Sequence, residues 1–275
     1  MTSVAGLLRA SPLPALETRI LLEHVLGWRR TELITRDDKE LPEESVERFD
    51  ALAQRRAAGE PIAQLVGMRE FFGLAFEVTP DVLIPRPETE LLVEIALEKL
   101  AGIEAPRVLD LGTGSGAIAV AIAFSHHNAR VWAVDQSAEA LAVATRNASR
   151  LLRPERNITL LKSDWTSALD PALRFDVIVS NPPYIAKNDP HLSEGDLRFE
   201  PRTALTDEAD GLAAIRTIVQ TAPFFLATGG SLWLEHGYDQ AADVRALVTA
   251  RGLSDVRSER DLAGIERVSG GFFAA

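Results

Sequence analysis

The sequence Asp110-Leu111-Gly112-Thr113-Gly114-Ser115-Gly116 decides the fold of this chain. It follows the apolar pair Val108-Leu109 and precedes the alanine-rich run 117–124, which gives the order strand, glycine turn, helix. Glycines let the backbone turn tightly and approach a ligand with no Cβ in the way. The first turn of the following helix offers free N–H groups to an anionic group. The motif therefore predicts a nucleotide-type binding loop.

Strand and helix patterns alternate around this loop, from residue 107 onward. Strands are predicted at 108–109, 131–134, 158–161, 177–179, 231–234, 256–258 and 267–269. Helices are predicted at 88–100, 117–124, 138–151, 211–226 and 240–250. This alternation is typical of an α/β fold with a doubly wound, mostly parallel, Rossmann-like sheet that carries helices on both faces. Ligands of such sheets bind beyond the carboxyl ends of the strands.

The residues before position 87 have a different character. Residues 1–65 show apolar positions at helical spacing, namely Leu13, Leu16, Ile20, Val25 and Leu26 in one segment and Val46, Phe49 and Ala53 in another. Residues 66–86 indicate two short strands with a turn near Gly73. We therefore expect a helical N-terminal domain at 1–65, a β-hairpin connector at 66–86 and the α/β domain at 87–275.

The composition is that of a folded protein with an acidic balance. The chain has 275 residues, of which 46% are hydrophobic, and a formal net charge of -11. No apolar run reaches the roughly 18 to 20 residues that span a bilayer, and the first ten residues lack the layout of a secretory signal. The absence of cysteine excludes disulfides and thiolate metal sites. Nucleic-acid binders usually carry a basic patch, so the charge favours another kind of substrate.

Further polar residues follow the predicted strands. Asp135 ends the second strand at the spacing of a ribose-binding carboxylate, which suits both a methyltransferase and a nicotinamide-dependent oxidoreductase. In a methyltransferase, Trp165 would stack on an adenine and Asp164 would accept from its exocyclic amine. The residues that we predict to bind the cofactor are Asp110, Gly112, Thr113, Gly114, Ser115, Gly116, Asp135, Asp164, Trp165 and Asn181.

The sequence Asn181-Pro182-Pro183-Tyr184 follows the fourth predicted strand and indicates the chemistry. An amide or aniline-type nitrogen is a poor nucleophile because its lone pair is delocalised into the neighbouring carbonyl or ring. The Asn181 side-chain oxygen and the Pro182 carbonyl are two acceptors that can hold both N–H bonds and direct the lone pair to an incoming methyl group. Consecutive prolines fix φ near -65° and preorganise these acceptors. We interpret Asn181, Pro182 and Tyr184 as catalytic, and all four residues as substrate-binding.

Together these residues resemble the bacterial release factor glutamine N5-methyltransferases. The resemblance covers nearly the whole chain. The segments that carry it are 59–63, 70–74, 82–90 (VLIPRPETE), 110–119 (DLGTGSGAIA), 181–185 (NPPYI), 200–201, 229–230, Glu235, Gly237, Gln240 and 261–264. The sequence departs from the family's usual pattern at His236, where an aliphatic residue is common, and at Ile265-Glu266.

The resemblance implies a substrate, a cofactor and an architecture. Its substrate would be the glutamine of the Gly-Gly-Gln motif in class I peptide chain release factors, and its methyl donor S-adenosylmethionine, with S-adenosylhomocysteine as product. It implies a seven-stranded methyltransferase domain and an N-terminal helical domain that recognises the substrate. We expect a cytoplasmic monomer that needs no metal, no membrane and no direct contact with nucleic acid.

Other functions stay open at this point. A ribosomal-protein glutamine methyltransferase is similar, but its connector tends to be Pro-Arg-Ser-Pro, whereas residues 85–90 here are Pro-Arg-Pro-Glu-Thr-Glu. An adenine or cytosine amino-methyltransferase would use the same displacement on a flipped base. A non-catalytic cofactor-binding protein is the remaining alternative. The sequence assigns no role to Arg86, Glu88, Glu200 or His236.

Overall fold

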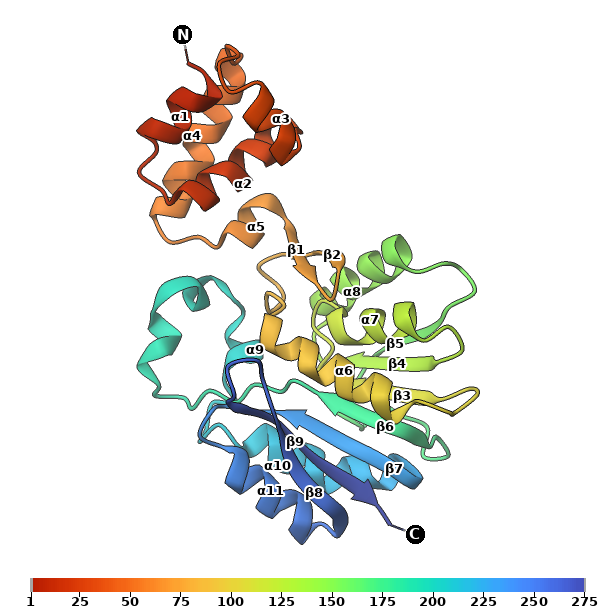
Figure 1. Cartoon of the computed structure of the whole chain (residues 1–275). Coiled ribbons are helices and arrows are strands. Elements are labelled where there is room, and N and C mark those ends of the chain that lie inside the picture. Colours follow the sequence, from red (N-terminus) through yellow and green to blue (C-terminus); the bar gives the residue numbers. More distant parts are fainter. Residues whose placement is uncertain (1, 275) are drawn as a thin grey trace. The chain divides into compact units, whose positions relative to one another are not determined.

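The computed structural model describes residues 2–274, which divide into two compact units. One unit contains residues 2–68 and Ser193–Phe199, and the other contains Arg69–Leu192 and residues 200–274. Figure 1 shows the elements of each unit. The chain thus leaves the second unit for seven residues and returns to it, a division that hydrophobic periodicity did not indicate.

The first unit is helical. Its helices are α1 (Val4–Ala10), α2 (Ala15–Leu26), α3 (Arg30–Thr35), α4 (Glu43–Ala57) and α5 (Ile62–Val66). The buried face of α2 carries Leu21, Leu22 and Val25, which pack with Phe49 of α4. Leu16, one of the apolar residues at helical spacing, is 65% exposed and does not belong to this face. It lies in the first turn of α2, two residues before the buried Thr18, which places it on the opposite side of the helix.

Side-chain contacts hold Ser193–Phe199 within the helical unit. The Arg56 guanidinium donates to Asp196 Oδ1 at 3.0 Å and also to Glu17 Oε2 at 2.9 Å. Gln64 Nε2 donates to the Phe199 carbonyl at 3.0 Å. Because Arg56 and Gln64 lie on α4 and α5, the excursion of the chain is fixed to two helices of this unit.

The second unit is built on a sheet that has seven strands within the described residues, in the order β5-β4-β3-β6-β7-β9-β8. The strands are β3 (Arg107–Leu111), β4 (Arg130–Asp135), β5 (Asn157–Lys162), β6 (Phe175–Ser180), β7 (Leu226–Glu235), β8 (Leu253–Arg260) and β9 (Glu266–Phe273). The five neighbouring strands β5, β4, β3, β6 and β7 run parallel, and β9 is antiparallel to both β7 and β8. The chain order reverses between β3 and β6, which is where doubly wound sheets bind ligands. The predicted fold class is confirmed.

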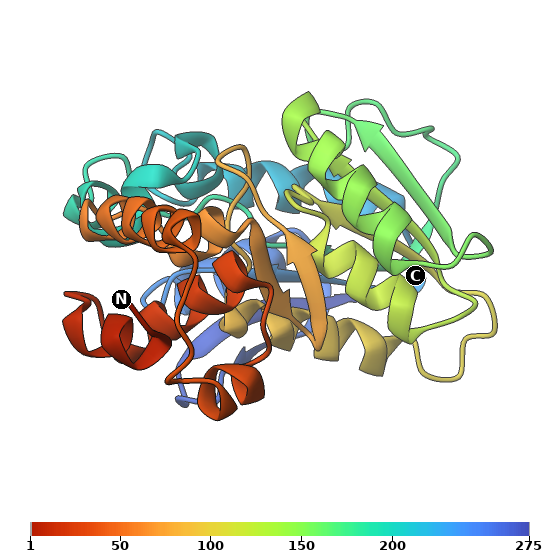
Figure 2. The same cartoon turned by 90° about the horizontal axis from the view of Figure 1, so that it is seen from above.

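Helices cover both faces of this sheet. Helices α6 (Glu90–Lys99), α7 (Ala117–Ser125) and α8 (Ala138–Leu151) pack on one face, and α10 (Ala213–Thr221) and α11 (Ala241–Ala250) pack on the other. Figure 2 shows α7 and α8 side by side. Each face of the sheet packs against its helices in a separate hydrophobic core. Successive residues of a strand point to opposite faces, so Val108 packs with α7 and Leu109 packs with α10. Burial on both faces explains the continuous apolar runs of these strands.

Two segments differ from the sequence-based expectation. The helix predicted at 211–226 ends at Thr221, because Pro223 cannot continue it; a short 3-10 helix, η4 (Ala222–Phe225), follows, and Leu226 already begins β7. The short elements η2 (Pro190–Ser193), η3 (Gly195–Phe199) and α9 (Arg202–Leu205) were not predicted. They are too short to show a hydrophobic period.

The hairpin is fixed to the second unit through side chains. Its strands are β1 (Met68–Phe71) and β2 (Leu74–Glu77). The Phe72 N–H donates to Glu90 Oε1 at 2.8 Å, and Asn147 of α8 both accepts from the Glu77 N–H and donates to its carbonyl. Within residues 2–274, no helix is long and apolar enough to cross a membrane.

Candidate active site

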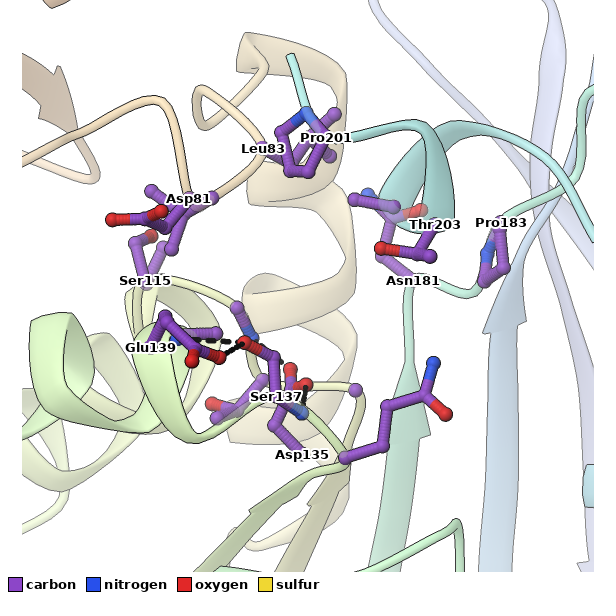
Figure 3. A pocket seen from close by; sticks show the side chains of 18 of the residues that line it. Asp81, Leu83, Ser115, Asp135, Ser137, Glu139, Asn181, Pro183, Pro201 and Thr203 are labelled. Carbon is purple, nitrogen blue, oxygen red and sulfur yellow. Dashed lines mark hydrogen bonds between the residues drawn. The ribbon is translucent and has the colours of Figure 1, made fainter.

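A cavity of about 310 Å³ lies in the second unit, lined by residues that follow the carboxyl ends of β3, β4, β5 and β6. This size is within the usual range of small-molecule sites. In Figure 3, Asp135, Ser137 and Glu139 gather on one wall, and Asn181, Pro183 and Thr203 lie across from them. The sequence-predicted residues that line the cavity are Gly112, Thr113, Gly114, Ser115, Asp135, Asp164, Trp165, Asn181 and Pro183.

Residues 112–116, the glycine loop, connect β3 to α7. Gly112, Gly114 and Gly116 have φ values of +74°, +54° and +81°, a region that favours glycine. The N–H groups of Gly112 and Thr113 both donate to the Val134 carbonyl at 2.9 Å. The loop is therefore held through its backbone by the neighbouring strand β4, and residues 112–115 line the cavity.

Two predicted residues of this region lie behind the cavity wall. Asp110 has no exposed surface, and its Oδ2 accepts from the Thr113 hydroxyl at 2.6 Å. Burial raises the pKa of Asp110 to about 7. Gly116 is the N-cap residue directly before α7, and a Cβ there would lie 3.1 Å from Ala144 Cβ. Both residues support the loop from behind and do not line the cavity.

Asp135 connects the glycine loop to the next strand. Its Oδ2 accepts from the Gly114 N–H at 2.8 Å, and its Oδ1 accepts from the Ser137 N–H at 2.9 Å. The Ser137 hydroxyl in turn donates to Glu139 Oε2 at 2.9 Å (Figure 3). The carboxylate therefore holds the loop in shape and also lines the cavity.

Asp164 and Trp165 lie on the wall that follows β5. Trp165 has a φ of +47°, unusual for a residue with a side chain, and its indole ring packs 3.5 Å from where a Cβ on Gly112 would lie. The Ser163 hydroxyl donates to the Trp165 carbonyl at 2.7 Å and stabilises this turn. The indole therefore closes over the glycine loop at Gly112, where the φ of +74° favours glycine.

Residues 181–184, the acceptor loop, follow β6. Asn181 lines the cavity, and its Nδ2 donates to the Thr89 hydroxyl oxygen at 3.1 Å. The end of β6 is fixed by Ser180, whose hydroxyl donates to the Leu111 carbonyl at 2.6 Å. Because its amide nitrogen is engaged by Thr89, Asn181 has its Oδ1 available to a ligand.

The other two motif residues lie farther from the cavity. Pro182 is buried, and neither Pro182 nor Tyr184 lines the cavity. The Tyr184 hydroxyl points to Glu235 Oε1 at 3.4 Å, and the Tyr184 carbonyl accepts from Gln240 Nε2 at 3.1 Å. In this structure Tyr184 thus anchors the acceptor loop to the end of β7.

Several residues of this region carried no role in the sequence. Thr89, Arg86, Asp81 and Glu139 line the cavity. Arg86 forms an ion pair with Glu200, whose Oε2 also accepts from the Ile84 N–H at 2.9 Å. Glu200 is only 6% exposed, so it ties the segment before α6 to the segment before α9. The position of Thr89, one residue before a helix and far from any strand end, gave no local signal.

The cavity wall carries an excess of negative charge. Among its lining residues that the structure describes, Asp81, Asp135, Glu139 and Asp164 are carboxylates, and Arg86 is the one cationic side chain. Arg86 is paired with Glu200. Such a lining favours a ligand with positive charge and disfavours a pyrophosphate.

The histidines and acidic loop residues contribute little to this site. His236 is fully buried, with its ring nitrogens bonded to the Ser269 hydroxyl and the Gly237 carbonyl, and burial lowers its pKa. His191 is exposed and bonded to Asp189. In residues 2–274 no group of three or more His, Cys, Asp or Glu side chains is placed to hold a metal ion.

Fold and site together define a methyltransferase of the seven-stranded class. Residues 87–195 match the model described as "Methyltransferase small domain", and residues 2–67 match "PrmC N-terminal domain". A methyltransferase structure from Pyrococcus furiosus has the same fold, with a TM-score of 0.53 and 21% identity over 81% of this chain and 98% of that one.

Relatives identified by sequence narrow the class of methyltransferase to one family. The release factor glutamine methyltransferase of Burkholderia pseudomallei is 67% identical over 98% of this chain and 95% of its own length. That of Bordetella pertussis is 56% identical over 99% and 100%, respectively. The chain belongs to the release factor glutamine methyltransferase family, and it is an enzyme of this class.

Proposed function

We propose that this enzyme transfers the methyl group of S-adenosylmethionine to the side-chain amide nitrogen (N5) of the glutamine in the Gly-Gly-Gln motif of class I peptide chain release factors. The observation that carries the proposal is Asn181, whose side-chain oxygen is available at the wall of a cavity built from the glycine loop and Asp135. The names of relatives more than 50% identical over nearly the whole chain support the substrate class.

The residues present fit S-adenosylmethionine. This cofactor combines a carboxylate with two positive centres, the sulfonium and the ammonium groups. The cavity is lined by Ser115, Ala117 and Ile118 at the start of α7, where a helix favours a carboxylate, and by four carboxylates in the remaining wall. Asp135 would hold the ribose hydroxyls, and Trp165 and Asp164 would hold the adenine. When bound, the cofactor supplies an electrophilic methyl carbon.

The protein's part in the reaction is to hold the amide nitrogen in line with that carbon. The Asn181 oxygen, at the cavity wall, accepts one N–H bond of the substrate amide. Pro182 does not itself line the cavity, and its carbonyl, on the residue after Asn181, would accept the second N–H bond when the substrate is bound. Together they would turn the lone pair of the nitrogen toward the methyl group. Positioning of this kind supplies much of the rate. No base needs to act first, because the nitrogen becomes acidic only as the new bond forms.

The same two acceptors give specificity. A substrate oxygen or carboxylate has no N–H to donate, so both acceptors would be left buried without a partner. Each unpaired group costs about 1 to 3 kcal/mol, which is a discrimination of roughly 5- to 150-fold per group. These two acceptors would therefore restrict the enzyme to substrates that present an –NH2 group.

The test is labelled methyl transfer from S-adenosylmethionine to three acceptors: a class I release factor, the same factor with its Gly-Gly-Gln glutamine replaced by alanine, and a DNA oligomer. We expect label only on the first. Label on DNA alone would refute the protein substrate. Equal label on both release factors would place the methyl group elsewhere. Because the proposed substrate acts in translation, we also propose the cytoplasm as the place of action.

The N-terminal helical unit is the part that we propose to recognise the release factor. Its buried residues form a hydrophobic core of their own. A ribosomal-protein substrate remains the second candidate, and adding ribosomal proteins to the same assay distinguishes the two.

A further inference from the structure

A buried carboxylate near the acceptor loop has no role in the mechanism above. Glu235, the last residue of β7, is 2% exposed. Strands β6 and β7 pair in register at Ser180 and Leu234, so Glu235 and Asn181 are the next residues of two adjacent parallel strands. A carboxylate is costly to bury, and this one is buried beside the residue that would hold the substrate amide.

The surroundings of Glu235 come from four segments. The Tyr184 hydroxyl approaches from the acceptor loop, the Thr89 hydroxyl and Glu88 from the turn before α6, and Arg267 from β9. Burial raises the pKa of Glu235 to about 7, while hydrogen bonding from Thr89 and Tyr184 and the charge of Arg267 act in the opposite direction. Arg267 itself is paired with Asp261 at 3.0 Å.

The hydrogen bonds of Glu235 in this structure are long or incomplete. The Tyr184 and Glu235 oxygens are 3.4 Å apart, and Glu235 Oε2 has no hydrogen-bond partner of normal geometry among residues 2–274. Catalytic hydrogen bonds are often long before substrate binds and shorten in the complex. Glu235 Oε2 is thus a buried acceptor without a donor of normal geometry among the described residues, in a carboxylate whose other oxygen faces the Tyr184 hydroxyl.

The direction of the hydrogen bonds between Glu235, Thr89 and Asn181 decides which end of the Asn181 side chain faces the substrate. A side-chain amide presents an acceptor at one end and two donors at the other, and its orientation is set by its partners. A threonine hydroxyl has one proton. If that proton goes to the ionised Glu235, the Thr89 oxygen can only accept, so Asn181 must turn its nitrogen to Thr89 and its oxygen to the cavity.

We infer that Thr89 and Glu235 are positioning residues that fix the amide orientation of Asn181, so that the acceptor and not the donor end of its side chain meets the substrate amide. The inference rests on the proposed function for the identity of that substrate. A flipped Asn181 would place two N–H donors against the donors of the substrate, and the reactive geometry would be lost.

The test compares Thr89→Val, which keeps the shape and removes the hydroxyl, with Thr89→Ser, which restores it. The matched control is Thr217→Val on α10, where the hydroxyl donates only to the Ala213 carbonyl of its own helix. We expect Thr89→Val to lower kcat roughly 5- to 150-fold, with cofactor Kd and Tm close to wild type. Thr89→Ser should recover most of kcat, and Thr217→Val should match wild type.

A second readout does not depend on turnover. In a 15N-labelled protein, the side-chain NH2 signals of Asn181 are identified by their absence from Asn181→Ala. We expect Thr89→Val and Glu235→Gln to shift these signals, and Thr217→Val to leave them in place. The kcat of wild type should rise with pH through about 7 as Glu235 ionises, whereas that of Glu235→Gln should be low and flat.

The outcomes separate the two proposals. If wild type labels no release factor, the proposed function fails, and the NH2 signals still test the hydrogen bond. If wild type is active and Thr89→Val has unchanged kcat and unchanged Asn181 signals, the inference is wrong. A parallel loss of cofactor affinity and Tm in Thr89→Val, or no recovery in Thr89→Ser, would show a merely structural role and overturn it too.

Discussion

The glycine loop and the acceptor loop lie at the same edge of one sheet, yet they are held in different ways. The glycine loop is fixed by backbone bonds to the adjacent strand and by Asp135, all within about 25 residues of sequence. The acceptor loop depends on contacts from far along the chain, such as Asn181 with Thr89, 92 residues away, and Tyr184 with Glu235, 51 residues away.

This difference separates binding from chemistry. The glycine loop is held by backbone bonds and by one carboxylate, Asp135, so a change there should alter cofactor binding and leave the orientation of Asn181 unchanged. A side chain that must present one particular end to a substrate depends on every partner that orients it. Mutations in the acceptor loop and its supports should therefore affect turnover, and mutations around the glycine loop should affect cofactor affinity.

The largest expected effect is that of Asn181→Ala. It removes the acceptor and leaves the glycine loop intact, so transfer should fall by about 10²- to 10³-fold or more, with cofactor Kd within a few-fold of wild type. Single-turnover kinetics and calorimetry measure the two quantities separately. A comparable loss in both would mean that the acceptor loop and the cofactor site act as one unit.

The second prediction concerns the cost of the buried carboxylate. A raised pKa in the folded state means that the folded protein holds its proton while the unfolded chain has lost it, so stability falls as pH rises from about 4.5 to about 7. This loss is on the order of 3 kcal/mol. Glu235→Gln lacks it, so the variant should gain stability relative to wild type across this window while it loses activity.

Denaturant unfolding of both proteins at pH 5 and pH 8 measures this gain. Asp110, whose pKa burial also raises to about 7, is present in both proteins, and its contribution cancels in the difference. A difference in unfolding free energy that does not change with pH would show that Glu235 titrates normally. The positioning role would then need no tuned charge.

Features that depend on local sequence could be predicted, and features that depend on distant segments could not. The glycine loop, Asp135 and the residues after β5 could be located, because strand, turn and helix patterns are local and the carboxyl ends of parallel strands share one edge. Thr89 and Glu235 could not, because their role depends on which segments the tertiary fold brings to Asn181. The motif at 181–184 located the acceptor loop, but it did not show that the Tyr184 side chain faces the end of β7.

The helical unit shows the same limit of local patterns. Hydrophobic spacing indicated a helix around Leu16 and Val25, but it did not show that Val25 is buried and Leu16 exposed. The inclusion of Ser193–Phe199 was not predictable, because it depends on single contacts such as Arg56 with Asp196. Long-range polar contacts leave no periodic signal in a sequence.

The third prediction tests the support that Asp135 gives to the glycine loop. Asp135→Asn keeps the shape but weakens two charge-assisted bonds, from the N–H groups of Gly114 and Ser137. The variant should lose roughly 10- to 100-fold in cofactor affinity, as expected for hydrogen bonds to a charged group, while kcat at saturating cofactor stays within a few-fold. A fall in kcat with unchanged Kd would place Asp135 with the acceptor loop instead.

The smallest expected effect is that of Trp165→Phe. The indole packs over Gly112, and a phenyl ring keeps part of that surface and its aromatic face. Loss of part of the stacking contact is worth about 0.5 to 1.5 kcal/mol, so cofactor Kd should rise by a few-fold to about tenfold and kcat should not change. Because Trp165 and Asn181 lie on different loops of one cavity, the double variant Trp165→Phe/Asn181→Ala should show additive effects. Non-additivity beyond about 0.5 kcal/mol would mean that the binding loops and the acceptor loop act as one unit.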